Sequence, residues 1–308
     1  MLRVCGGVVF FGLCLVFLVP PCSGGNILVF PVDGSHWINM RIILEELHAR
    51  GHSITVIRAS SSWYIKENKL GYWTLINRLI TLSVCSERRC ITVVFLQNES
   101  LVKQIFDSKY DLVLIDPAMS VGLVLAKYFN LPVVLNVRWI SSGEGHFVLA
   151  PSPLSYIPVP GSGLTDKMNF IQRLKNIFFL GIIKFQQWVM VGPIYDEFCS
   201  KYIEGGCDIV SLLQQADIWL FRSDFVFDFP RPTMPNVVYI GGFQCKPAEP
   251  LPADLEKFVQ SSGEHGVIIM TLGTLVNALP KDVADEIATV FSKMPQKVTD
   301  YILSIFLV

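Results

Sequence analysis

Two polar residues, His36 and Asp116, each follow an apolar run that predicts a buried strand. His36 lies in FPVDGSHWINM, after the run NILVFP, and Asp116 ends the run YDLVLID. In open parallel sheets, ligands bind beyond the carboxyl ends of the strands, so both side chains are expected at one edge of one sheet. Asp116 would there accept a hydrogen bond from one imidazole nitrogen and stabilise the imidazolium that forms when the other nitrogen takes a proton. The alternative is structural, with a polar residue at a helix entrance and a cap at a strand end.

The sequence offers no obvious protein nucleophile to accompany this pair. It contains no G-x-S-x-G elbow, and neither a G-x-G-x-x-G nor a P-loop pattern follows any predicted strand. A histidine and an aspartate without such a partner indicate that the substrate supplies the nucleophile, for instance as a hydroxyl.

A small-residue turn provides a second candidate element. TLGT, at 271–274, follows the predicted strand GVIIM, and its Gly273 and Thr274 can point a backbone amide and a hydroxyl at a phosphate. An ordinary tight turn is the alternative interpretation of the same four residues.

An alternation of short apolar runs with helical periodicity predicts the elements that position these residues. Apolar residues recur at helical spacing from Met40 to Leu47, with Ser35 as the expected N-cap and Gly51 as the expected stop. Strand and helix in turn predict an α/β fold with a parallel sheet that is covered on both faces. The expected strands after NILVFP are SITVIR (53–58), ITVVF (91–95), YDLVLID (110–116), LPVVLNV (131–137), ADIWLFRS (216–223) and NVVYIGG (236–242), with helices over 99–108 and around 121–128.

Two longer segments follow the predicted fifth strand. The segment 141–165 is rich in Pro, Gly and Ser but carries large apolar residues, which predicts an ordered irregular loop of the kind that often lines sites. A helical region is expected over 166–202. Its part 170–190 is very apolar but is interrupted by basic residues, so it is not expected to span a membrane. Packing in a core or against another subunit is favoured there over contact with a membrane surface.

Composition limits the class of protein. The 308 residues are 51% hydrophobic and 17% charged, with a formal net charge of -1, which fits one complete domain and part of another. No long basic block favours nucleic acid, so a small or apolar partner is expected. The Pro-rich stretch 245–255 predicts an interdomain linker, and a new strand and a helix from about Lys281 to Met294 follow it.

The amino-terminal end predicts entry into the secretory pathway. Residues 1–24 hold a basic Arg3, an apolar run and then prolines and small residues, which is the layout of a cleavable signal peptide. In a luminal compartment Asn98, in the sequon Asn-Glu-Ser, would be a glycosylation site. Cys85 and Cys90 either pair or remain thiols.

Several long motifs together resemble the vertebrate UDP-glucuronosyltransferase family. In order along the chain they are DGSHWINMRIILEELHARGHSITVI, YDLVLIDP, ADIWLFRSDFVFDFPRPTMPNVVYIGGFQCKP and FVQSSGEHGVIIMTLGTLV, followed by MPQKV. The resemblance runs from about Gly25 to Val298. It implies the GT-B type of fold, in which two Rossmann-like domains face a cleft, here an acceptor domain over 25–244 and the start of a UDP-sugar domain over 256–298.

The resemblance also implies residue roles. His36 matches the family's catalytic base and Asp116 the acid that orients it. Thr274, after Gly273, stands where the family usually has a serine at the donor phosphates. Trp37 and the 141–165 loop are expected walls for a lipophilic acceptor. The implied reaction is an inverting displacement without a metal or cofactor, with a UDP-sugar, expected to be UDP-glucuronic acid, as co-substrate.

Localisation and partners are implied in the same way. Family members lie in the endoplasmic reticulum lumen, held by a carboxyl-terminal membrane anchor. Association with other family members is expected, and contact of residues 170–190 with a membrane is the further alternative for that segment.

The chain departs from the family after Val298. The apolar tail TDYILSIFLV (299–308) replaces most of the donor domain and the anchor, which is expected of a truncated member. Two hypotheses follow: a glycosyltransferase that uses His36, or an inactive form that binds an acceptor or pairs with and modulates full-length family members.

Overall fold

A parallel sheet of seven strands carries both catalytic candidates. The strand order in space is β3-β2-β1-β4-β5-β6-β7, and every neighbouring pair is parallel. The computed structural model describes residues 24–59, 62, 64–66, 74–79, 98–138, 148, 152–226, 228–272 and 279–300. The strands are β1 (Asn26–Phe30), β2 (Ser53–Ala59), β3 (Thr74–Leu79), β4 (Leu112–Ile115), β5 (Val133–Val137), β6 (Ile218–Phe221) and β7 (Val237–Tyr239).

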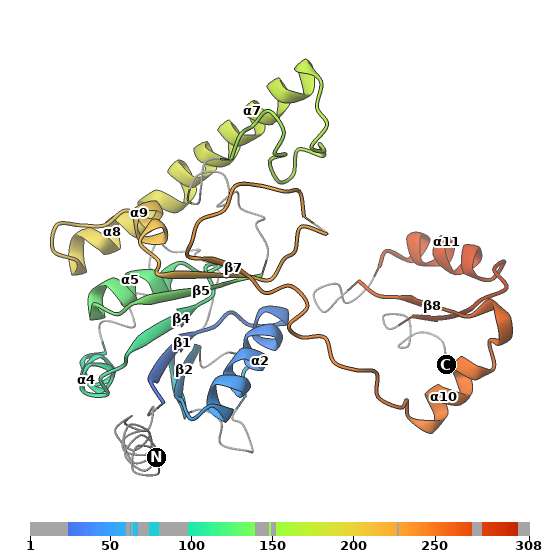
Figure 1. The fold of residues 1–308 in the computed structure, drawn as a ribbon, viewed down its shortest axis with the longest axis horizontal. Helices are drawn as coiled ribbons and strands as arrows, with labels where there is room; N and C mark the ends of the chain where they lie inside the picture. The colour runs from blue at the N-terminus through green and yellow to red at the C-terminus, as the bar shows by residue number, and fades with distance from the viewer. Residues whose placement is uncertain are drawn as a thin grey trace, which may run out of the picture. The chain divides into compact units, whose positions relative to one another are not determined.

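Apolar side chains leave the sheet on both faces, as the unbroken apolar runs predict. Along β1, Leu28 belongs to one hydrophobic cluster and Val29 to the other, because successive side chains of a strand point to opposite faces. Helix α2 (Ser35–Ala49) covers one face, with Met40 and Leu44 fully buried. The other face is covered by α4 (Glu99–Asp107), α5 (Val121–Phe129) and α9 (Ile209–Gln214). Figure 1 shows α2 and α5 on either side of the strands.

One glycine lets α5 approach the sheet closely. A Cβ at Gly122 would lie 2.8 Å from Ile115 Cγ2 and 3.1 Å from Phe30 Cβ, so no larger side chain fits without a shift. The first turn of α5 therefore packs directly against the ends of β1 and β4, just behind Asp116.

The sheet contains one strand that the sequence analysis missed. β3 pairs with β2 at the sheet edge, and its sequence TLINRL places Asn77 and Arg78 within an apolar run, which hides the period of two. The strand expected at 91–95 and the cysteines 85 and 90 lie outside the described residues.

The helical region 166–202 is present, but in three segments. They are α7 (Phe170–Gln186), the π-helical turn η1 (Gln187–Val191) and α8 (Gly192–Tyr202). Asn169 begins α7 with a capping box, in which its side chain accepts from Gln172 N and its backbone N–H donates to the Gln172 side chain.

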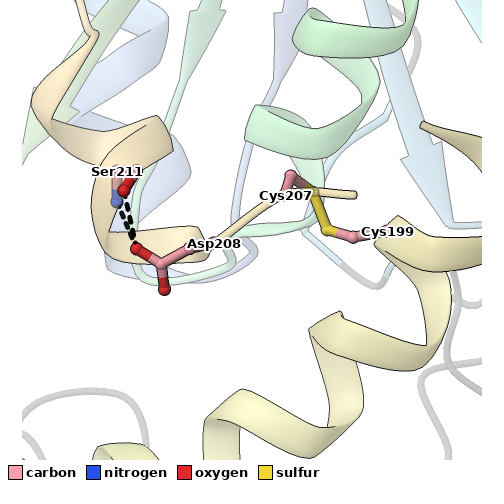
Figure 2. The surroundings of a disulfide bond; sticks show 4 residues. All are labelled: Cys199, Cys207, Asp208 and Ser211. Carbon is pink, nitrogen blue, oxygen red and sulfur yellow. Dashed lines mark hydrogen bonds between the residues drawn. A yellow bond between two sulfur atoms is a disulfide. The ribbon is translucent and has the colours of Figure 1, made fainter. Parts of the chain in front are cut away.

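The structure contains a disulfide that the sequence analysis did not predict. It joins α8 to the segment just before α9 (Ile209–Gln214). Cys199 and Cys207 are bridged over a Cα–Cα distance of 5.1 Å (Figure 2). Asp208 then caps α9, because its carboxylate accepts from the backbone N–H and the hydroxyl of Ser211, each at 2.8 Å (Figure 2). The glycines 205 and 206, both with positive φ, turn the chain between the two cysteines.

Helix α7 leaves a large apolar surface exposed. Asn176 is its one buried residue, while Phe178 and Phe185 are 66% and 60% exposed. Subunit packing and membrane contact both remain predictions for this surface. Among the described residues, no helix is long and apolar enough to cross a membrane.

Residues from Cys245 onward form a second unit of the chain. The linker expected over 245–255 ends earlier, because α10 (Ala253–Gln260) begins after Pro252, which occupies the N-cap position. The expectation of a single strand is also wrong: β8 (Val267–Met270) pairs in parallel with β9 (Lys297–Asp300), which takes the first two residues of the expected tail. The other elements of this unit among the described residues are the turn η2 (Gly263–His265) and α11 (Lys281–Phe291).

Candidate active site

His36 and Asp116 meet at the carboxyl edge of the sheet. His36 is the second residue of α2, and Asp116 directly follows β4. The distance from His36 Nδ1 to Asp116 Oδ2 is 2.6 Å. Because an ionised carboxylate only accepts hydrogen bonds, Nδ1–H is the donor and the basic lone pair lies on Nε2. The contact predicted from topology is present, and the catalytic roles remain predictions.

The carboxylate of Asp116 is held on several sides. Its side chain is 2% exposed, against 14% for His36. Oδ1 accepts from Ala118 N at 3.0 Å, and the backbone N–H of Asp116 donates to Phe30 O at 3.1 Å. The second bond ties the end of β4 to the end of β1. Asp116 is therefore fixed in place, and His36 is the more accessible member of the pair.

The helix that carries His36 begins one residue earlier than expected. Gly34, and not Ser35, is the N-cap of α2, and no side chain caps the helix there. Gly34 has φ 72° and ψ -138°, a backbone conformation that residues with a Cβ avoid. Ser35 instead lies within the first turn, where its carbonyl accepts from Asn39 Nδ2 at 2.7 Å. The stop at Gly51 is confirmed, since α2 ends at Ala49 and Gly51 has φ 90°.

Two arginines that the sequence analysis did not single out follow the next two strands. Arg138 comes directly after β5 and Arg222 directly after β6. Arg222 Nη1 donates to Asn39 Oδ1 at 3.0 Å, which connects it to the amino-terminal part of α2. Burial and the positive charge of Arg222 lower the pKa of Arg138, while the nearby Asp116 carboxylate acts in the opposite direction. The residue after each of three consecutive strands, β4, β5 and β6, is thus charged.

The two arginines line a pocket of about 460 Å³ in the first unit. One wall is the irregular segment 158–164, as expected of a loop that lines a site. This loop is ordered, because Ile157 and Val159 are buried and Val159 N donates to the buried Asn176 of α7 at 2.7 Å. The lining residues are Arg138, Pro158, Val159, Pro160, Gly161, Ser162, Gly163, Leu164, Arg222, Ser223, Asp228, Phe229 and Arg231.

The remaining predicted site residues have different positions. Trp37 is 3% exposed and packs in the core beneath α2, so its ring does not line the pocket, and the expected acceptor wall at Trp37 is not supported. Gly273 and Thr274 lie outside the described residues. Asn98 caps α4: its Oδ1 accepts from Leu101 N at 3.2 Å, so the sequon residue has a structural role besides the predicted glycosylation.

Three solved structures with a similar arrangement of elements are glycosyltransferases. A spinosyn forosaminyltransferase superposes with a TM-score of 0.54 and 14% sequence identity. The match covers 90% of this chain and 65% of the forosaminyltransferase chain. The match to a glycosyltransferase of kitacinnamycin has a TM-score of 0.55 and 15% sequence identity, and it covers 91% of this chain and 66% of that glycosyltransferase. A UDP-glucosyltransferase from Polygonum tinctorium gives a TM-score of 0.53, with 91% and 66% covered and 12% identity. The fold is that of the GT-B glycosyltransferases.

Sequence comparison narrows this class to a family. Residues 25–77 and 66–300 match the family model "UDP-glucoronosyl and UDP-glucosyl transferase", and the chain belongs to this family. UDP-glucuronosyltransferase 1A5 of Rattus norvegicus is 35% identical in an alignment of length 319 that covers 92% of this chain and 60% of the relative. UDP-glucuronosyltransferase 1A3 of Homo sapiens is 34% identical, with 93% and 60% covered. The chain spans about 60% of the length of these relatives.

Proposed function

We propose that the protein is a UDP-glycosyltransferase that moves glucuronic acid, or another hexosyl group, from a UDP-sugar to a hydroxyl of a small lipophilic acceptor. The observation that carries the proposal is the 2.6 Å contact between His36 Nδ1 and the buried Asp116 carboxylate at the carboxyl edge of the sheet. The family and the names of its members supply the donor class.

His36 is the general base in this mechanism. Nε2 takes the proton of the acceptor hydroxyl, the oxygen forms a bond to the anomeric carbon, and the bond from that carbon to the UDP oxygen breaks on the opposite face. Asp116 holds the imidazole through Nδ1–H and stabilises the imidazolium by its negative charge. The configuration at the anomeric carbon inverts, because there is a single displacement. For Gly273 and Thr274 we propose contact with the donor phosphates, on the basis of family resemblance.

For localisation we propose the endoplasmic reticulum lumen. The Cys199–Cys207 disulfide supports an oxidising compartment, since such bonds are rare where thiols are kept reduced. The expected signal peptide and glycosylation of Asn98 belong to the same proposal.

The test measures glycoside formation by the 308-residue chain with UDP-glucuronic acid and with UDP-glucose on a panel of phenolic and alicyclic alcohols. His36→Ala is expected to lower turnover by roughly 10²–10⁴-fold, the usual contribution of a positioned base. The matched control is His265→Ala, because His265 is exposed in η2 and no role is assigned to it.

Three outcomes separate the hypotheses. A folded His36→Ala variant with unchanged turnover contradicts the assignment of the base. Loss of activity in His265→Ala as well indicates a general defect rather than loss of a base. Acceptor binding by the unmodified chain without any transfer favours the alternative of a non-catalytic form.

A further inference from the structure

Three arginines line the pocket described above. They are Arg138, Arg222 and Arg231, and Asp228 is the one acidic residue among the described lining residues. Asp228 already accepts a hydrogen bond from the hydroxyl of Ser223. Since guanidinium stays charged in proteins, the lining carries a net positive charge.

Two of these guanidinium groups have unsatisfied buried nitrogen atoms. Arg222 Nε and Arg231 Nη1 have no hydrogen-bond partner among the described residues, although both atoms are shielded from solvent. Burial lowers the pKa of Arg231, and the Asp228 carboxylate opposes that effect only in part. A buried donor on a charged group without an acceptor is costly, so the site is suited to an anion that supplies one.

The rest of the lining is largely apolar. Val159, Leu164 and Phe229 contribute side chains, and prolines 158 and 160 form part of the loop wall. Such a lining accommodates a hydrocarbon body next to the charged end of a ligand. The pocket of about 460 Å³ therefore fits a small amphipathic anion better than a free inorganic ion.

The position of the pocket relates it to the acceptor and to the base. Arg222 donates to Asn39, which in turn donates to the carbonyl of Ser35, next to His36. Arg138 lies close enough to Asp116 for its pKa to respond to that carboxylate. All lining residues belong to the first unit of the chain, up to Gln244. Arg222 and Asn39 thus connect the pocket to the turn of α2 that carries His36.

We propose that this pocket binds a carboxylate carried by the acceptor, at a distance from the hydroxyl that receives the sugar. Arg222 and Arg231 donate to the carboxylate oxygens, in the geometry that guanidinium and carboxylate share. The apolar wall holds the body of the molecule, and the hydroxyl at its other end reaches His36. The preferred substrates are then hydroxylated aromatic or alicyclic acids. The assignment of the pocket to the acceptor rests on the proposed function. Anion binding by the pocket does not depend on it.

The experiment measures binding by calorimetry, without any donor and without turnover. The probes are 6-hydroxy-2-naphthoate, its methyl ester and 2-naphthol, which share one ring system and differ in the anionic group. The free acid is expected to bind about tenfold or more tightly than the ester, the effect of one or two charge-assisted hydrogen bonds. The preference should decrease as salt is added, because an ionic contact is screened. Equal affinities of acid and ester overturn the proposal.

Variants locate the site on the protein. Arg231→Gln is expected to remove the preference for the acid while leaving the affinity for 2-naphthol within about twofold, and Arg231→Lys to restore part of it. Arg41→Gln is the control, since Arg41 is an exposed arginine on α2 that pairs with Glu45. A preference that survives in Arg231→Gln, or that Arg41→Gln removes equally, contradicts the assignment.

A final arm distinguishes the acceptor from the donor as the source of the carboxylate. UDP-glucuronic acid and UDP-glucose are added in competition with 6-hydroxy-2-naphthoate. If neither displaces the probe, the acceptor assignment stands. Displacement by UDP-glucuronic acid alone would assign the pocket to the sugar carboxylate and overturn it. Because the readout is binding, loss of all transferase activity leaves this result interpretable, and the two proposals fail separately.

Discussion

Asp116 is a positioning residue in the proposed mechanism, because it acts on the acceptor only through His36. Its carboxylate is 2% exposed and bonds to His36 Nδ1 and Ala118 N. Asp116→Asn keeps the size of the side chain and removes its charge, so the imidazolium loses its stabilising partner. The expected result is a fall in kcat of roughly 10²-fold or more with little change in acceptor KM.

A structural role alone would change a different quantity. If Asp116→Asn lowered the melting temperature and changed KM while kcat stayed within about threefold of the original value, Asp116 would be a structural cap and not part of the catalytic pair. Thermal unfolding of the same preparation is therefore measured beside the kinetics.

Single residues also show what the sequence could predict. The pair His36 and Asp116 was predicted because both follow apolar runs, and parallel topology brings the ends of such runs to one edge. The same rule reaches Arg138, after LPVVLNV, and Arg222, at the end of ADIWLFR. Their importance depends on burial in a shared pocket and, for Arg222, on an Nε without a hydrogen-bond partner among the described residues, and neither feature is visible in the sequence. The burial of Trp37 between α2 and the sheet is likewise visible only in the structure.

At the scale of elements, Asn176 holds the loop that lines the arginine pocket. It is fully buried on α7, where Oδ1 accepts from Val159 N at 2.7 Å and Nδ2 donates to Ile157 O at 2.8 Å and Leu154 O at 3.0 Å. Asn176→Ala leaves these backbone groups without partners. We expect a loss of roughly 2–4 kcal/mol of unfolding free energy, given about 1–3 kcal/mol for each unsatisfied buried group and partial relaxation.

Hydrogen exchange localises this effect. Amides of residues 154–164 should exchange faster in Asn176→Ala, and the affinity for 6-hydroxy-2-naphthoate should fall with them. The matched control is Asn169→Ala, which removes the N-cap of the same helix at an expected cost of about 1 kcal/mol without changing exchange in the loop. Unchanged loop exchange in Asn176→Ala would show that α7 does not hold this wall.

Elements with strong periodicity were predicted well, and those defined by their neighbours were not. The helix at 99–108 and the strands at 131–137 and 216–223 correspond to α4, β5 and β6. β3 and β9 were missed, because an edge strand or a short strand is stabilised mainly by pairing with its neighbour. Such a strand can form without a clear apolar pattern in its own sequence. The break between α7 and α8 at η1 does have a sequence signal, because Pro193, two residues after QWVMV, cannot donate to the carbonyl of Val189.

At the scale of the whole chain, the first unit contains the seven described strands of the main sheet, the pair His36 and Asp116, and the arginine pocket. The composition predicted one complete domain and part of another, and the chain divides into units after Gln244. The proposed chemistry of the base and of acceptor binding therefore depends on residues within one unit.

The disulfide of this unit provides a prediction about stability and compartment together. The Cys199–Cys207 bridge closes a short loop with a sequence separation of 8. A disulfide that closes a loop of that length lowers the entropy of the unfolded chain and thereby raises the free energy of unfolding by roughly 2–3 kcal/mol. The double variant Cys199→Ser/Cys207→Ser should unfold at lower urea, and dithiothreitol should lower the midpoint of the unmodified protein to the same value. Cys245→Ser is the matched control, because Cys245 is an exposed free thiol in the described part of the chain. A midpoint that does not respond to dithiothreitol would mean that the bridge contributes nothing to stability, and it would remove the support that the disulfide gives to a luminal location.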